Sequence, residues 1–432
     1  MKSKYFNYCL FYLTIICFLF TSTTVVKAQQ LKKDIKLISE KYELIGGTIV
    51  LFNKNKITDV VNFGNSNIET NNPINNNTLF RVASISKTIT TIALMQLVDQ
   101  KKINLDDNIS KILGYEISNP FYTDVAITPR MLLSHTSCLT DDPKTYDSFL
   151  SVAYEQNPVP NLSELMNSNG KYFSKALFLN QKPGLYFNYC NLNYGIIGTL
   201  IEKISGERFD NYCQKYIFTP LGINATYNVK TIADNNQLAT IYRKIDGNWI
   251  PQCDHYNDKN KLPENFDDYI TGTNAIRFAP QGGLRISGSD LAKVFTLFLN
   301  DGKYLNQQII SKSSIAAMTT SQWKFDGTNG DYANGLYRNW GLGIHLITNT
   351  KDNDEIFSGN VSMFGHSGDA YGLVSDAFVD AKKGNGFIFI TNGSGSGYVT
   401  DDCSSFYAIE KEIFETVEKQ FKIPVLKSAV HK

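Results

Sequence analysis

Ser84 and Lys87 are the residues of this sequence whose types and spacing most directly suggest chemistry. They stand three positions apart at the start of a segment with helical periodicity, so both side chains fall on one helix face. The serine hydroxyl would then lie beside an amine that can take its proton, and the helix N-terminus would add a partial positive field and a backbone N–H. A Ser-x-x-Lys pair occurs by chance about once in a chain this long, and a capping serine followed by a solvated lysine is the alternative.

The loop that carries Tyr189 and Asn191 is a second candidate. It follows the turn Pro183-Gly184 and precedes an apolar helix, and two side chains at this spacing in a loop can point the same way. A phenol can carry a proton, and an amide can donate a hydrogen bond to a substrate carbonyl. An ordinary capping loop with a half-buried tyrosine is the alternative interpretation.

A third candidate is the segment Gly365-His366-Ser367-Gly368, which leads into a β-rich run. A polar side chain two positions before a glycine on an edge strand could bind the polar end of a substrate, while Gly368 would let the substrate backbone approach. Taken singly, His366 is more often a structural or surface histidine. The ordered set of serine, tyrosine and histidine elements is what indicates an active site.

The elements that must bring these residues together are strands at both chain ends and helices between them. Strand patterns cover 46–63 (a hairpin), 341–348, 373–380 and 386–391, and helical patterns cover 33–42, 86–101, 194–205, 289–300 and 406–421. We therefore predict an α+β fold, in which an antiparallel sheet formed from both chain ends is flanked by helices. A mostly helical lobe, roughly residues 103–300, would be inserted into it.

Length and charge narrow the class of protein. The chain has 432 residues and a formal net charge of +1, so it lacks the basic excess of a dedicated nucleic-acid or polybasic membrane-binding protein. No internal repeat and no linker divides it, and we expect residues 29–432 to form a single two-lobed domain. The five histidines show no metal-ligand spacing, so we expect no metal and no cofactor.

Residues 1–28 resemble a secretory signal peptide. Two lysines precede an apolar run, and Val26-Lys27-Ala28 suits cleavage before Gln29. An uncleaved membrane anchor is the alternative, since the run approaches the roughly 20 residues that span a bilayer. We expect an exported protein, periplasmic or extracellular, with no stable membrane span after cleavage and a small molecule or peptide as its partner. Five cysteines would remain, an odd number.

The three candidate sites together resemble the motifs of the serine β-lactamase and penicillin-binding-protein superfamily, and specifically its class C-like branch of DD-peptidases, D-aminopeptidases and esterases. The run from Ser84 to Lys87 resembles the Ser-x-x-Lys box. Tyr189-Cys190-Asn191 matches the Tyr-x-Asn box, and His366-Ser367-Gly368 stands where Lys-Thr-Gly or His-Thr-Gly would be. The resemblance extends from about residue 46 to residue 421.

This resemblance implies catalysis through an acyl-enzyme. Ser84 would be the nucleophile, and Lys87 and Tyr189 would share its activation, the tyrosine then protonating the leaving group. Which of the two is the base stays open. The remaining implied roles are the oxyanion hole, from the backbone N–H groups of Ser84 and Asp369, substrate orientation by Asn191, and a pocket lined by His366 beside Gly368.

Departures from the superfamily pattern shape the expected substrate. His366 replaces the lysine of most β-lactamases, which favours a peptidase or esterase. Asp369 would repel an anionic substrate unless Arg285 neutralises it, and a disulfide between Cys138 and Cys190 could border the site. We rank D-amino-acid peptides first, small esters second and β-lactams third. A penicillin-binding sensor or scaffold without turnover is the competing, non-enzymatic hypothesis.

Overall fold

Strands from both ends of the chain form one antiparallel sheet. The structure is a computed structural model that describes residues 27–156, 158–256, 266, 268–359 and 361–422. In spatial order the main sheet contains β11 (Trp323–Lys324), β12 (Asn339–Trp340), β13 (His345–Leu346), β14 (Met363–Ala370), β15 (Leu373–Asp380), β16 (Asn385–Thr391), β1 (Gly46–Asn53), β2 (Ile57–Asn67) and β3 (Asn72–Pro73). The pairing of β1 with β16, from Gly47 opposite Thr391 to Asn53 opposite Asn385, joins the two chain ends.

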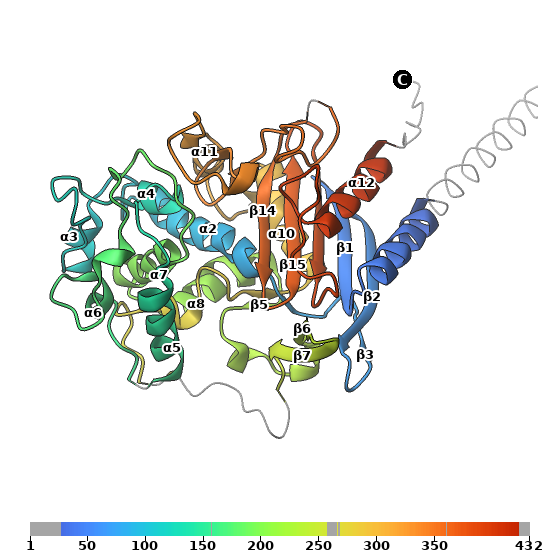
Figure 1. Ribbon diagram of the computed structural model, residues 1–432, viewed down its shortest axis with the longest axis horizontal. Coiled ribbons are helices and arrows are strands. Elements are labelled where there is room, and N and C mark those ends of the chain that lie inside the picture. The colour runs from blue at the N-terminus through green and yellow to red at the C-terminus, as the bar shows by residue number, and fades with distance from the viewer. Residues whose placement is uncertain (1–26, 157, 257–265, 267, 360, 423–432) are drawn as a thin grey trace, which may run out of the picture.

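Helices cover both faces of this sheet (Figure 1). They are α2 (Ser86–Asp99), α3 (Ile109–Leu113), α4 (Pro129–Leu133), α5 (Ser148–Glu155), α6 (Ser163–Met166), α7 (Leu192–Ser205), α8 (Phe209–Cys213), α9 (Thr219–Leu221), α10 (Gly288–Leu299), α11 (Lys312–Met318) and α12 (Ala408–Lys422), and residues 27–41 are also helical. The predicted fold class, a large antiparallel sheet flanked by helices, is confirmed.

The alternation of side chains along β1 explains why the sheet needs two helical covers. Ile49 and Leu51 pack into a cluster with α12 and the 27–41 helix, whereas Val50 and Phe52 pack into the larger cluster with α2, α7 and α10. A strand buried on both faces reads as a continuous apolar run, which is what β1 shows.

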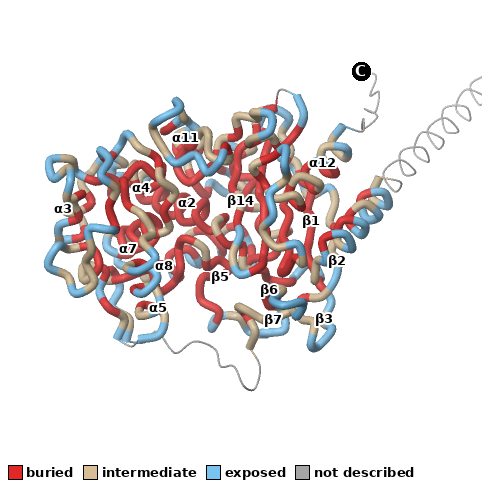
Figure 2. Tube along the Cα trace, viewed as in Figure 1, coloured by how far each residue is buried: buried red, intermediate tan, exposed pale blue. Residues whose placement is uncertain are grey.

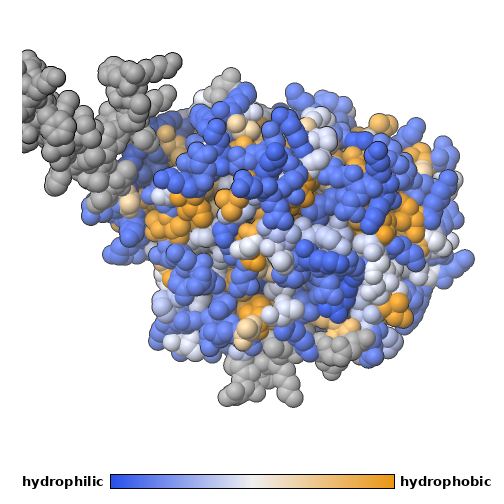
Figure 3. All heavy atoms as spheres, turned by 180° about the vertical axis from the view of Figure 1, so that it is seen from behind, coloured by the Kyte–Doolittle hydropathy of each residue, from blue (hydrophilic) through white to orange (hydrophobic). Residues whose placement is uncertain are grey.

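Helix α2 lies at the centre of the larger cluster, and its residues from Ser86 to Leu97 are all buried (Figure 2). Because protein surrounds it, the residues at its N-terminus are held by contacts from several sides. The outer surface is different: the face in Figure 3 is largely hydrophilic, with apolar side chains in separate groups. No helix of the described residues is long and apolar enough to cross a membrane.

Two sequence predictions need correction. Of the strand expected at 341–348 only β13 forms, because Gly343, between β12 and β13, turns the chain with a φ of 63°. The segment 103–300, expected to be mostly helical, also contains strands: β5 (Ala225–Thr226) and β8 (Arg285–Ile286) form a small sheet with β4 (Phe80–Arg81), and β6 (Ile241–Ile245) pairs with β7 (Asn248–Cys253). Just beyond it, β9 (Lys303–Tyr304) pairs with β10 (Gln307–Gln308).

The signal peptide expected at residues 1–28 lies almost entirely outside the described residues. Only its last two residues are described, and they begin the 27–41 helix. That helix packs Leu31, Ile35 and Ile38 against the sheet, at positions spaced for one helical face.

Candidate active site

Ser84 lies in a 3₁₀ turn (η1, Ala83–Ile85) that leads directly into α2. The preceding Ala83 has a φ of 43°, a left-handed conformation that costs energy for a residue with a side chain and that is typical of functional sites. Strand β14 lies against this turn: a Cβ atom at Gly368 would come within 2.9 Å of the Ser84 backbone nitrogen. Glycine at this position therefore lets β14 border the serine.

Lys87 is fully buried, and its amine contacts three oxygen atoms. Nζ lies 3.0 Å from Ser84 Oγ, 2.7 Å from Asn191 Oδ1 and 2.8 Å from the carbonyl oxygen of Gln281. Burial lowers the pKa of Lys87 to about 7, although nearby acidic groups, Asp141 foremost, favour the charged form. The amine is therefore neutral in a substantial fraction of molecules near pH 7, and it touches the serine hydroxyl.

Asn191 is held between Lys87 and a carboxylate that the motif analysis did not identify. Its Nδ2 donates to Asp141 Oδ2 at 2.9 Å, and its backbone N–H donates to the same oxygen at 2.7 Å. The other carboxylate oxygen of Asp141 accepts the backbone N–H of Leu192, the first residue of α7, at 2.9 Å. Asp141 lies in the loop after α4, fifty positions before Asn191 in the sequence. No spacing pattern in the sequence indicates this contact.

Tyr189 lies over the lysine, with Lys87 Nζ 4.9 Å from the centre of its ring. The ring stacks on His135 at 4.4 Å and on Tyr337 at 5.2 Å. Burial raises the pKa of Tyr189 well above its ordinary value, and a hydrogen bond with Ser84 opposes that rise. The phenol therefore stays protonated at neutral pH and can act as a proton donor.

His135 supports the tyrosine loop. Its Nδ1 accepts the backbone N–H of Cys190 at 3.0 Å, and burial lowers the pKa of the ring well below the usual histidine value. The ring is thus a neutral structural group.

His366 lies behind Tyr189 and is only 2% exposed. Its ring packs edge-on against Tyr189 at 6.2 Å and against Trp340 at 5.4 Å, and Nδ1 lies 2.6 Å from the carbonyl oxygen of Ser367. Burial and the charge of Lys87 lower the pKa of His366 to about 3, so the imidazole is neutral. The ring contacts the phenol and does not line the cleft described below.

The cleft in front of Ser84 has a volume of about 290 Å³. Its walls include Asn191 and the exposed Asp369, together with Asp141, Asp147, Tyr146, Tyr154, Leu150, Gln281, Tyr371, Arg81 and Arg243. Surrounding atoms displace water from the Asp369 carboxylate and raise its pKa, while Lys87 opposes the rise. Arg285 does not neutralise Asp369, because it binds both oxygens of Asp254, at 2.7 and 3.0 Å.

The structure therefore brings Ser84, Lys87, Tyr189 and Asn191 into contact and packs His366 behind the tyrosine. Gly368 lies against the serine turn, and Asp369 follows it at the cleft wall. Within the described ranges, no group of histidine, cysteine or acidic residues could hold a metal ion.

The disulfide considered between Cys138 and Cys190 is not formed. Both residues are buried free thiols. Cys190 Sγ donates to Asp141 Oδ1 at 3.2 Å, and Cys138 Sγ lies 3.9 Å from the carbonyl oxygens of Thr136 and Tyr186. The thiol of Cys190 thus belongs to the same polar network as Asn191.

Comparison with known proteins gives a consistent result. The family model described as beta-lactamase matches residues 31–403. The protein flp of Staphylococcus aureus (strain N315) is 24% identical over 206 residues, which are 48% of this chain and 39% of flp. The chain thus spans about two fifths of the length of the curated relatives that it matches.

Solved structures share the fold. A penicillin-binding protein homologue from Pyrococcus abyssi superposes with a TM-score of 0.64 at 23% identity, over 85% of this chain and 74% of that one. A D-amino acid amidase from Ochrobactrum anthropi SV3 superposes with a TM-score of 0.63 at 16% identity, over 93% of this chain and 100% of that one.

Proposed function

This chain belongs to the beta-lactamase family, and from that membership we propose that it is a serine hydrolase that cleaves an amide or ester through an acyl-enzyme on Ser84. The observation that carries the proposal is the buried amine of Lys87, 3.0 Å from the serine hydroxyl, with a pKa lowered to about 7. An amine with this pKa can accept a proton near neutral pH, which an ordinary lysine cannot.

Lys87 is the proposed general base for acylation. A neutral amine has two N–H groups and one lone pair. Two of its contacts, Asn191 Oδ1 and the Gln281 carbonyl oxygen, are acceptors that can only receive an N–H. The lone pair is then left facing the Ser84 hydroxyl, which it deprotonates as Oγ attacks the substrate carbonyl carbon.

Tyr189 is the proposed acid. Because its pKa is raised, it carries its proton at neutral pH and can give it to the leaving nitrogen or oxygen. The ammonium formed on Lys87, next to the tyrosine ring, can then return a proton to the phenolate. In deacylation the same proton path runs backwards: Tyr189 passes its proton to Lys87 and takes one from the attacking water, and Lys87 protonates Ser84 Oγ as its bond to the acyl group breaks. The backbone N–H groups of Ser84 and Asp369 are the proposed oxyanion hole, worth roughly 3 kcal/mol per donor.

D-amino-acid peptides or amides are the proposed first substrate class, and small esters the second. His366 stands where most β-lactamases carry a lysine, but its ring is neutral and packed behind Tyr189. It therefore offers no cation to the carboxylate of a β-lactam, which supports placing β-lactams third. The amide oxygen of Asn191 contacts Lys87, and its amide nitrogen contacts Asp141. We therefore propose that Asn191 orients Lys87 as well as forming part of the cleft wall. We also propose that the protein is exported after cleavage before Gln29, which N-terminal sequencing of the protein from its host would test.

Residues 29–432 are proposed to form one two-lobed domain. The larger apolar cluster, which includes α2 and α7, and the smaller one beneath α12 both contain side chains of β1, so a single strand contributes to both. One cooperative unfolding transition, seen equally by near- and far-ultraviolet circular dichroism, is expected; two separate transitions would contradict it.

The decisive experiment compares the wild type with Ser84→Ala. A fluorescent penicillin or fluorophosphonate should label the wild type and not the variant, and p-nitrophenyl acetate or a D-Ala-D-Ala peptide should be turned over many times per wild-type molecule. Labelling without turnover would identify the non-enzymatic sensor instead. Unchanged turnover in Ser84→Ala, on a substrate that the wild type hydrolyses, would refute the proposed mechanism.

A further inference from the structure

One carboxylate, that of Asp141, organises the loop between Tyr189 and α7. It accepts four hydrogen bonds: from the backbone N–H groups of Asn191 and Leu192, from Asn191 Nδ2, and from the thiol of Cys190 at 3.2 Å. Charge-assisted hydrogen bonds of this kind are stronger than neutral ones. They cap α7 with a side chain from a distant loop, because Asn191 itself makes no side-chain cap.

The position of Asp141 determines which way the amide of Asn191 points. In the observed orientation Nδ2 faces the carboxylate and Oδ1 faces Lys87. If the amide turned by 180°, its oxygen would face the carboxylate of Asp141, and two acceptor oxygens in contact repel each other. The carboxylate therefore excludes the turned amide.

The orientation of this amide decides where the amine of Lys87 directs its lone pair. While Asn191 Oδ1 accepts one N–H and the Gln281 carbonyl oxygen accepts the other, the lone pair faces the nucleophile. A turned Asn191 would offer N–H donors instead, and the lone pair would be drawn toward them and away from Ser84. The amine of Lys87 would stay beside Ser84, but its lone pair would no longer point at the hydroxyl.

We propose that Asp141 is a positioning residue that makes Lys87 a base toward Ser84, by fixing the amide orientation of Asn191. The inference rests on the proposed function, in which the lysine deprotonates the serine. Asp141 touches neither reacting atom; it acts through Asn191.

Asp141 also affects the charge state of Lys87. It contributes the largest of the charge effects that favour the ammonium, so its removal should lower the pKa of the lysine further. The other titratable groups around the amine come from the segment at the start of α7, from β14 and from the loop after α4; they are Tyr189, Cys190, Tyr194, His366, Asp369 and His135.

The test is Asp141→Asn, with Asp142→Asn as matched control. The substitution at Asp141 keeps the size of the side chain and one acceptor for the α7 backbone, whereas Asp142 caps only Thr145. We expect kcat of Asp141→Asn to fall about 100-fold, with KM little changed, because a small misplacement of a catalytic group lowers the rate by about that factor. The acid limb of kcat/KM should move to lower pH. Asp142→Asn should retain both the wild-type rate and the wild-type limb.

A double-mutant cycle separates positioning from general support. If Asp141 acts through Asn191, the loss from Asp141→Asn should largely disappear in an Asn191→Ala background. Additive losses together with an unmoved acid limb would overturn the proposal. Its failure is distinguishable from failure of the proposed function, because in the latter case Ser84→Ala and Lys87→Ala would themselves leave turnover unchanged. Thermal unfolding of each variant identifies any loss that comes from misfolding.

Discussion

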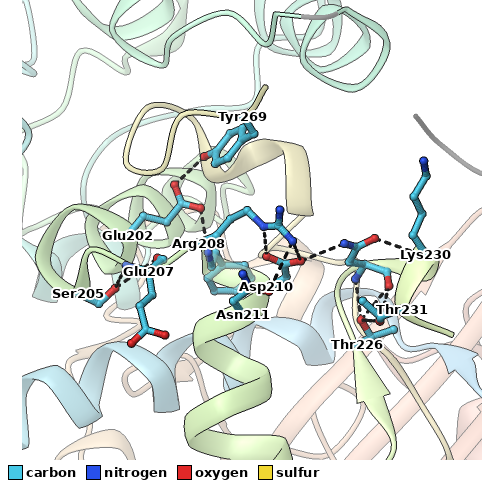
Figure 4. A network of polar contacts seen from close by, with 12 residues as sticks. Glu202, Ser205, Glu207, Arg208, Asp210, Asn211, Thr226, Lys230, Thr231 and Tyr269 are labelled. Carbon is cyan, nitrogen blue, oxygen red and sulfur yellow. Dashed lines mark hydrogen bonds and ion pairs between the residues drawn. The ribbon is translucent and has the colours of Figure 1, made fainter. Parts of the chain in front are cut away.

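The two ends of α7 each carry a buried polar network, and only one of them faces a cleft. At the N-terminal end, Asp141 contacts Asn191, and Asn191 contacts Lys87, which in turn contacts the half-buried Ser84. At the other end, Glu202 accepts a hydrogen bond from the Tyr269 hydroxyl at 2.6 Å (Figure 4). It also accepts hydrogen bonds from the backbone N–H groups of Gly272 and Phe209, at 2.7 and 2.9 Å. Both networks hold together segments that are far apart in the sequence.

Burial shifts the pKa of the central group at both ends, in opposite directions. It lowers the pKa of Lys87 and raises that of Glu202, and both come to about 7. Glu202, however, has protein donors on both oxygens and does not line the cleft of Ser84. A shifted pKa therefore does not by itself identify an active site; the contact with a nucleophile beside a cleft does.

The largest expected difference between the two ends is in rate. Lys87→Met keeps a chain of similar size but removes the amine, and we expect a loss in kcat of about 1,000-fold or more, because general base catalysis is worth up to roughly 10⁴. Steady-state hydrolysis of a p-nitrophenyl ester measures it. Glu202→Gln should hydrolyse the same ester at the wild-type rate, and an equal loss in both variants would erase the distinction.

The second expected difference is in the pH dependence of stability. Glu202 has a folded pKa of about 7, above its ordinary 4.5, so its favourable contribution is complete below pH 4.5 and is lost as the pH rises through 7. This corresponds to about 3 kcal/mol. Urea unfolding at pH 4.5 and pH 8 should show that the wild type loses about this much free energy relative to Glu202→Gln. A constant gap between the two proteins would contradict the raised pKa.

The smallest expected effect comes from the tyrosine that binds Glu202. Tyr269→Phe removes one hydrogen bond to the buried carboxylate but keeps the ring, which packs edge-on against Phe278 at 5.0 Å. We expect a loss of about 1.5 kcal/mol in the free energy of unfolding and no change in kcat. A fall in kcat would mean that the C-terminal end of α7 also supports the reaction, and would contradict a catalytic role for the N-terminal end alone.

Local patterns in the sequence predicted many of the helices and strands, because apolar residues recur every second position in a strand and every three or four positions in a helix. The spacing of Ser84 and Lys87 follows from one helical turn, and β15 covers the predicted 373–380. Sequence reasoning did not find Asp141, because its contacts join a loop to residues fifty positions away. It also could not show that His366 is buried against Trp340 and Tyr189, since that burial depends on how three segments pack.

The enclosure of α2 has a consequence for how protons move during turnover. Lys87 has no surface in contact with bulk water, so a proton that it takes from Ser84 cannot be exchanged quickly with solvent. We expect the site to reuse that proton and carry it internally from the nucleophile to the departing group. A proton inventory of kcat in mixtures of H₂O and D₂O, which counts the protons that move in the rate-limiting step, should then show more than one.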